Sequence, residues 1–332
     1  MSTYKAINGQ KVQYLSSDPP APFVGQVWYN STSGSLKYNS GTLVQGWSSQ
    51  PNMNVGRKEM AASGASSTSA LSFGGNQAPG PKVNSVESYN GSWTVQTGMP
   101  SDRWRNGGTG TQTLALSVGS DSPTGAGAAT VDSYNGSWTG QTALPSPKRQ
   151  LGLTGTTTSA LAFGGGPDNS PPQENATLSY NGSWTAQPNM VGKQRGLAAS
   201  GTETAALAFG GYDQPGSGRV TRTQTYNGSW TEVAGMNNAR NYLGGCGTQT
   251  NALALAGETG PGLYKLTEGW DGTAWTNLPN MSLAHGSGAN GAGANSTSAI
   301  CFGGGDSPNT GARDKTESFL DNNLGNRIIT TS

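Results

Sequence analysis

The sequence YNGSWT occurs four times, letter for letter, at residues 89–94, 134–139, 180–185 and 226–231. Successive copies begin 45, 46 and 46 residues apart. A fixed interval of this length indicates one supersecondary unit repeated along the chain, and a period near 45 residues is that of a four-stranded propeller blade. The period constrains the fold strongly, because each unit must bury its apolar face against its neighbours.

Three markers follow the same period. Tryptophans recur at spacings of 46, 45, 46, 46 and 45 residues, at Trp47, Trp93, Trp138, Trp184, Trp230 and Trp275. Before most of them comes an apolar strand ending in a glycine doublet, as in ALSFGG at 70–75 and ALAFGG at 160–165, with degraded copies around Val118 and Leu255. After each comes a short turn carrying a basic residue or histidine, such as NMNVGR at 52–57. No sustained 3.6-residue period occurs, so the chain is predicted to be all-β.

Asn-Gly between strand-like flanks is a strong hairpin signal, and it favours a two-residue type I′ turn with positive φ at both central residues. Tyr89 and Trp93 are therefore predicted to lie on paired strands, in aromatic contact. The preceding strand consists of small residues, as in GLAASG at 196–201. Small side chains are expected where several strands converge on an axis.

These features together resemble the kelch repeat: an apolar strand ending in Gly-Gly, an aromatic residue, a Trp, then Met-Pro and Arg. The unit departs from it in the uniformly short YNGSW turn and in the two copies without the glycine doublet. The resemblance covers about residues 44–320 and implies a six-bladed kelch-like β-propeller of four-stranded antiparallel blades, here assigned to residues 43–332. The strand around Trp47 is expected to complete the sixth blade; a rival closure would use NRIITTS at 326–332.

Residues 1–42 lie outside the period and read as an extended arm followed by short strands. About 40 residues of this kind cannot bury much core alone, so they need a partner surface. The segment VQYLSSDPPAPFVGQVWYNSTSGSLKY at 12–38 resembles a leader of structural proteins of tailed, marine-type phages, especially fibre-type proteins. The resemblance implies a virion-anchoring segment, and its candidate contact residues are Trp28, Tyr29 and Tyr38.

Composition excludes several classes of function. Charged residues make up 11% of the chain and the net charge is +1, which argues against nucleic-acid binding. No apolar run reaches the length of a membrane helix and no export signal is visible, so membrane insertion is not expected.

Cys246 and Cys301 are interpreted as buried thiols. A single histidine, His285, cannot build a multi-histidine metal site, so no cofactor, metal or catalytic residue is predicted. Calcium bound by the aspartate-containing loops is the alternative.

The repeats differ mainly on one predicted face, which carries the loops between the second and third strands of each blade and the connections between blades. Variable loops on a rigid frame are the usual place for binding. The candidate ligand-binding residues there are Arg57, Arg103, Trp104, Arg105, Arg149, Arg195, Tyr212 and Arg240. Trp104 is read either as a stacking platform or as packing against a blade. The repeat arginines have the alternative of hydrogen-bonding loop carbonyls within their own blade.

The sequence is therefore interpreted as a non-enzymatic virion structural protein, a fibre or appendage component on the particle exterior. Its expected partners are other virion proteins, through residues 1–42, and a host-surface glycan or receptor; a homo-oligomer, such as a trimer, is also expected. A purely structural or decorating protein is one alternative. A glycan-active propeller enzyme is another, for which WDGTAW at 270–275 is one weak relative of an Asp-box turn. A cellular kelch protein is the third.

Overall fold

The computed structural model describes residues 12–19, 26–38, 44–121, 127–167, 174–213, 218–259, 265–286, 290–305, 311–322 and 327–328. Strands and no helices occur in these ranges, so nothing in them is a helix able to cross a membrane. The chain divides into two compact units. One, called here the propeller, spans Gly46–Phe319, and the other, the terminal unit, combines Met1–Gln45 with Leu320–Ser332.

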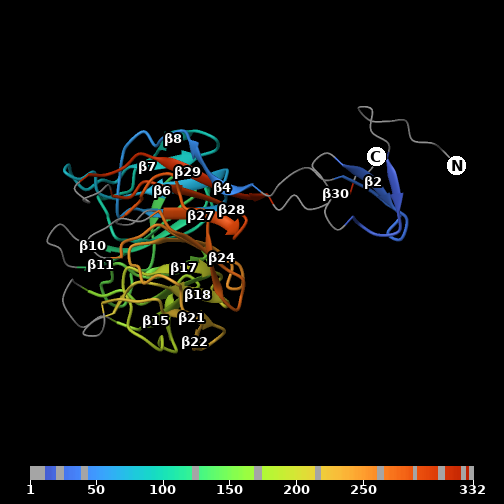
Figure 1. The fold of residues 1–332 in the computed structure, drawn as a ribbon. Coiled ribbons are helices and arrows are strands. Elements are labelled where there is room, and N and C mark those ends of the chain that lie inside the picture. The colour runs from blue at the N-terminus through green and yellow to red at the C-terminus, as the bar shows by residue number, and fades with distance from the viewer. Residues whose placement is uncertain are drawn as a thin grey trace. The chain divides into compact units, whose positions relative to one another are not determined.

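Four-stranded antiparallel sheets, the blades, follow one another along the propeller (Figure 1). Blade one contains β5 (Ala61–Ser66), β6 (Ser69–Phe73), β7 (Val86–Tyr89) and β8 (Trp93–Gln96). Blade two contains β9 (Gly107–Gly110), β10 (Ala115–Asp121), β11 (Gly127–Tyr134) and β12 (Trp138–Gly140). Blade three contains β13 (Gly152–Gly155), β14 (Ala160–Phe163), β15 (Thr177–Tyr180) and β16 (Trp184–Gln187).

The second half of the propeller repeats this arrangement. Blade four contains β17 (Ala198–Gly201), β18 (Ala206–Phe209), β21 (Thr223–Tyr226) and β22 (Trp230–Val233), with a small ribbon of β19 (Tyr212–Asp213) and β20 (Gly218–Arg219) in its loop. Blade five contains β23 (Gly244–Gly247), β24 (Ala252–Leu255), β25 (Thr267–Trp270) and β26 (Trp275–Leu278). Blade six contains β27 (Asn290–Asn295), β28 (Ser298–Phe302), β29 (Thr316–Asn322) and β4 (Val44–Gln50).

The blades form a closed ring. Contacts between first strands run from β5 through β9, β13, β17 and β23 to β27, and β27 returns to β5. The strand that completes blade six is β4, from the other end of the chain, beside β29 (Figure 1). Trp47 of β4 packs against Phe319 of β29 with ring centroids 5.3 Å apart. The expected closure by the strand around Trp47 is confirmed, and the described residues of NRIITTS, in β30 (Arg327–Ile328), pair elsewhere.

Aromatic contacts join blades one, two, four and five to the blade before each of them. Trp230 lies 4.8 Å from Phe163 of the preceding blade and 5.2 Å from Tyr226 of its own hairpin, centroid to centroid. The indole nitrogen of Trp230 also donates to Thr177 Oγ1 of the preceding blade at 2.8 Å. The tryptophan of the repeat therefore holds neighbouring blades together, and the predicted contact between Tyr89 and Trp93 is present at 5.2 Å.

The hairpin turn differs from the sequence prediction. Tyr89 pairs directly with Trp93, so Asn90, Gly91 and Ser92 form a three-residue loop. Within that loop only Gly91 has a positive φ, of 104°. The expected two-residue type I′ turn was wrong, because the opposed Tyr–Trp pair leaves one more residue in the turn, and three-residue hairpins need only one left-handed position.

The glycine doublets allow the second strand to turn under the next blade connection. Gly74 has a φ of +69°, and a Cβ added there would lie 2.5 Å from the Arg103 carbonyl oxygen. In blade five the corresponding residue is Ala256, which keeps the same left-handed backbone with a φ of 54°. The degraded copy therefore retains the geometry of the repeat at a conformational cost.

In the terminal unit, β1 (Gln13–Leu15) pairs parallel to β2 (Val27–Asn30), β2 pairs with β3 (Ser35–Tyr38), and β3 pairs with β30. The boundary predicted at residue 43 falls close to the observed one, but Leu320–Ser332 groups with the terminal unit rather than with the propeller. The reason is that β30 adds to the sheet edge offered by β3. Both ends of the chain thus contribute to one small sheet.

Candidate functional site

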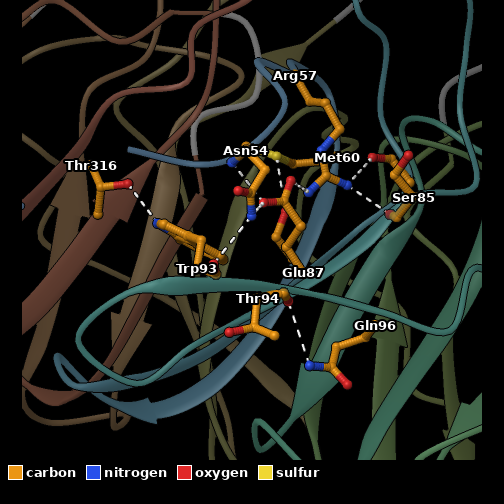
Figure 2. A network of polar contacts seen from close by, with 11 residues as sticks. Asn54, Arg57, Met60, Ser85, Glu87, Trp93, Thr94, Gln96 and Thr316 are labelled. Carbon is orange, nitrogen blue, oxygen red and sulfur yellow. Dashed lines mark hydrogen bonds and ion pairs between the residues drawn. The ribbon is translucent and has the colours of Figure 1, made fainter. Parts of the chain in front are cut away.

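One residue of each blade connection is buried beneath the loop face. These residues recur every 45 or 46 positions and are Arg57, Arg103, Lys148, Gln194, Arg240 and His285. In blade one, Arg57 Nη2 donates to Glu87 Oε1 at 2.9 Å, and its Nη1 donates to the carbonyl oxygens of Gly74 and Ser85 at 3.0 and 2.7 Å (Figure 2). Glu87 also accepts from the backbone N–H of Asn54 at 2.7 Å. The pair fixes the connection to its own blade.

Other blades repeat this device with different chemistry. Arg240 donates to Glu268 at 2.9 Å and to the Ala256 carbonyl at 2.7 Å. In blade six the pair is His285 and Glu317, whose Nε2 and Oε2 are 3.1 Å apart. Burial acts to raise the pKa of Glu317, but hydrogen bonds from His285 and two backbone amides outweigh burial and hold the pKa below its usual range. His285 thus has a structural partner.

Three blades vary the pair further. In blade two Arg103 pairs with Asp132. In blade four two amides replace the charges, with Gln224 donating to Gln194. In blade three the acidic position is Leu178, and Lys148 pairs with Glu174 from the neighbouring loop instead. The position is therefore used for internal polar pairing even where its residue type changes.

This burial corrects part of the predicted ligand-binding surface. Arg57 and Arg240 are 0% exposed and Arg103 is 4% exposed, so none of them offers its guanidinium to an external ligand. The alternative, hydrogen bonding to loop carbonyls within the blade, is what Arg57 and Arg240 do. Arg149 is 1% exposed and pairs with Asp121. All four guanidinium groups stabilise the frame.

Trp104 is also removed from the candidate surface. It is only 4% exposed, and the ammonium of Lys82 lies 3.5 Å from the centroid of its ring. The packing alternative for Trp104 therefore holds. Arg195 and Tyr212 remain half-buried on the loop face, where an antiparallel bridge joins them and the guanidinium carbon lies 5.4 Å from the Tyr212 ring centroid.

A second series of positions lies two residues after the buried one and surrounds the end of the central channel. Its described members, here the channel mouth, are Glu59, Arg105, Gln150, Gly196 and Tyr242. All five have a φ between 52° and 60°. Each backbone N–H donates to the carbonyl of the preceding member, at 2.7, 2.8, 2.9 and 2.8 Å from Arg105 to Tyr242. This chain of hydrogen bonds fixes the outline of the mouth.

Two side-chain groupings lie at the channel mouth. Arg105 donates to Glu59 Oε1 at 2.7 Å and to Asp121 Oδ2 at 3.1 Å. Burial disfavours its charge, but Glu59, Tyr242 and Asp121 outweigh burial and raise the pKa of Arg105. Gln150 Nε2 donates to Tyr242 Oη at 2.8 Å, across the intervening Gly196. Arg105 is thus the predicted site residue that reaches the mouth.

The mouth opens into a cavity of about 340 Å³ along the axis of the ring. Its wall consists of the first strands of the blades, and hydroxyl groups there link consecutive blades: Thr109 Oγ1 donates to the Gly155 carbonyl at 2.8 Å, and Ser200 Oγ donates to the Thr248 carbonyl at 3.2 Å. Cys246 takes the corresponding position in blade five, where burial raises the pKa of its thiol to about 12. The cavity therefore has a rigid, polar wall.

Sequence reasoning missed Glu59, Gln150 and Tyr242. Their signal was present in the period, since each is 45 or 46 residues from a neighbouring member of the series that contains Arg105. It was hidden because the series varies in residue type. Within the described part of the chain no cluster of three or more His, Cys, Asp or Glu could hold a metal ion. The central residues of most aspartate-containing loops considered for calcium lie outside that part.

The candidate anchoring residues lie in the terminal unit. Trp28 is 0% exposed, and its indole nitrogen donates to Asp18 Oδ1 at 3.0 Å, so it forms the core of that unit and is not an external contact. Tyr29 stacks on Tyr14 at 5.0 Å between centroids, and Tyr14 is 74% exposed. The side chain of Tyr38 lies outside the described residues. Tyr14, which sequence reasoning did not select, is an exposed aromatic residue of this sheet.

Neither a protein-family model nor a curated protein sequence matches the chain. Among solved structures, that of YjhT is similar, with a TM-score of 0.68 over 85% of this chain and 99% of that chain. The two sequences are 12% identical over this match, so the likeness concerns the fold alone. Together with the closed ring of four-stranded blades, it establishes the fold as a β-propeller.

Proposed function

We propose that this chain is a non-enzymatic virion structural protein of a tailed phage, whose terminal unit attaches to the particle and whose propeller presents its loop face to a bacterial glycan or receptor. The resemblance of residues 12–38 to a phage fibre-type leader motivates the viral assignment. The structural observation that carries the division of labour is the sheet β1-β2-β3-β30, which gathers both ends of the chain into a unit distinct from the ring.

The terminal unit has the properties of an attachment module. Its sheet is small, and the buried Trp28 and Asn30 and the partly buried Lys37 all bond to the carboxylate of Asp18. The hydrogen bonds from Lys37, Asn30 and Trp28 lower the pKa of Asp18 far below its usual range, so the carboxylate stays charged. The exposed Tyr14 lies in β1, one of the two edge strands of this sheet, and an edge strand can pair with a partner chain.

The propeller has the properties of a display frame. Most cations of the repeat are used inside the blades, and of the candidate binding residues Arg105 lies at the channel mouth while Arg195 and Tyr212 form a pair on the loop face. A rigid ring with binding groups at one face suits attachment to a host surface. Several copies on one particle, for example as trimers, would raise the strength of attachment through multivalency.

The location is tested by immunogold imaging of particles of the phage that carries the gene, with antibody raised against the recombinant chain. Label on the exterior of the particle supports the proposal, and labelled cell fractions with unlabelled particles overturn it. Attachment is tested by binding the fluorescent full chain to host cells, with a Tyr14→Asp variant as a control that changes only the terminal unit. A decorating role without a host ligand predicts particle label but no cell binding.

A glycan-cleaving activity is the second candidate, because two carboxylates, Glu59 and Asp121, pair with Arg105, and Tyr242 lines the same cavity. Both carboxylates are held in ion pairs with Arg105. Incubation of the purified chain with host polysaccharide decides between the two functions. Sustained release of reducing ends, lost in Glu59→Gln, would replace the attachment proposal by an enzymatic one.

A further inference from the structure

The amide of Gln150 is incompletely bonded at the channel mouth. Its side chain is only 7% exposed and lines the cavity, yet Oε1 has no hydrogen-bond partner among the described residues, while Nε2 donates to Tyr242 Oη. Turning the amide over would exchange the two atoms and leave the nitrogen without a partner instead. Because an unpaired buried polar atom costs about 1–3 kcal/mol, binding of a group that pairs with Gln150 Oε1 would be favourable.

Tyr242 adds a second unfilled position beside it. Its oxygen accepts from Gln150, so its own O–H proton remains to be donated. A hydroxyl group is the chemical group that fits both neighbours, since it can donate to Gln150 Oε1 and accept from Tyr242. It also fits the reversed amide, because a hydroxyl both donates and accepts.

The charges at the mouth select against an anionic ligand. Arg105 is matched by Glu59 and Asp121, and Asp121 also pairs with Arg149, so two guanidinium groups face two carboxylates. No cation in this set is left over to neutralise a ligand carboxylate or phosphate. An incoming anion would lose its hydration without a charge-assisted replacement, whereas a neutral polyol would not.

We propose that the channel mouth binds a neutral saccharide ring, with Gln150 and Tyr242 as the pair that recognises one of its hydroxyl groups. This inference rests on the proposed attachment function and names its ligand class. The cavity of about 340 Å³ lies in the range of small-molecule sites. The Tyr242 ring lies against Gly196, where an added Cβ would be 3.1 Å from it, so an aromatic surface is fixed beside the hydroxyl position.

The direct test is saturation-transfer NMR on the full chain, with glucose, galactose, mannose and N-acetylglucosamine as neutral probes and N-acetylneuraminic acid as the anionic one. We expect transfer to at least one neutral sugar, stronger than to N-acetylneuraminic acid. Absence of transfer to every neutral probe, or stronger binding of the anionic one, overturns the inference. Because this measurement uses the unaltered chain, it is independent of any folding defect in a variant.

Variants then locate the site. Tyr242→Phe removes one hydroxyl and should weaken binding of the neutral sugar by roughly threefold to tenfold, the loss of one hydrogen bond. The matched control is Tyr226→Phe. It removes a hydroxyl that donates to Gln187 Oε1 at 3.4 Å and does not line the cavity, so it should leave the affinity for the sugar unchanged. Equal affinities of the two variants overturn the assignment. If the chain labels particles and binds cells but no neutral sugar binds, the ligand class fails while the proposed function stands.

Discussion

One buried indole nitrogen at the blade interfaces, that of Trp138, has no hydrogen-bond partner among the described residues. In four interfaces the tryptophan donates to a threonine three residues before the hairpin aromatic of the preceding blade, with Nε1 to Oγ1 distances of 2.8–3.0 Å. These pairs are Trp47–Thr267, Trp93–Thr316, Trp230–Thr177 and Trp275–Thr223. Trp138 faces blade one, where the equivalent residue is Val86, and its buried Nε1 has no partner among the described residues.

Val86→Thr should therefore stabilise the protein. Threonine has nearly the shape of valine and would place Oγ1 where the other interfaces have it. The gain is the relief of an unpaired N–H, about 1–3 kcal/mol, and the cost is about 1 kcal/mol for the buried methyl replaced by a hydroxyl. The net expectation is about 0–2 kcal/mol of added stability, measured by calorimetry or urea unfolding.

Val131→Thr is the matched control. It makes the same replacement in blade two, where the indole of Trp184 already donates to the Thr142 carbonyl at 2.9 Å. That variant gains no relief and should lose about 1 kcal/mol. Thr177→Val should lower the free energy of unfolding by about 1–3 kcal/mol, because it leaves Trp230 Nε1 without its hydrogen-bond acceptor. If Val86→Thr is as destabilising as Val131→Thr, the interface hydrogen bond does not contribute as argued.

Three further predictions concern single positions. Ala256→Gly should add about 1 kcal/mol of stability in urea unfolding, since glycine adopts the φ of 54° there without strain; unchanged stability would contradict this cost. The pKa of Glu317 is lower in the folded state than in the unfolded state. Its carboxylate therefore stabilises the fold above the unfolded pKa, and this stabilisation is lost as the pH falls through the folded pKa. Glu317→Gln should reduce the loss of stability on acidification, measured by calorimetry at stepwise pH. Cys246 and Cys301 are buried with raised thiol pKa values, so Ellman's reagent should find no reactive thiol in the native chain and two in denaturant; rapid labelling of native protein would contradict their burial.

The propeller fold could be predicted from the repeat, because the repeated residues make the same local packing contacts in each blade. Trp47 could be assigned to the closing strand from spacing alone, since a blade without an outer strand leaves an edge. The three-residue hairpin was missed, because Asn-Gly occurs in several turn types and only the opposed pair of Tyr89 and Trp93 decides between them. The pairing of β30 with β3 was missed for a similar reason, since two strand residues carry little pattern.

The candidate site was harder to predict, because a side chain buried in the blade and a side chain at the channel mouth are only two positions apart in the sequence. Arg103 and Arg105 are close in sequence and chemically identical, yet one pairs with Asp132 inside the blade and the other lies at the channel mouth. The turn between the two positions decides their directions, and sequence spacing does not report it. The bonding of the Gln150 amide, whose Nε2 donates to Tyr242 while its Oε1 has no partner among the described residues, depends on distances between blades three and five that only the closed ring defines.

The closure of blade six also dictates an order of events during synthesis. Its outer strand, β4, is made early, whereas its neighbour β29 begins at Thr316. At ribosomal rates of about 5–20 residues per second, β4 waits on the order of tens of seconds for the strand it pairs with. Blades one to five can form in sequence as they emerge, but blade six closes only after β29 has left the ribosome. A nascent chain stalled before β29 is therefore an open ring with an unpaired strand, the form in which newly made copies are most exposed to misassembly with each other.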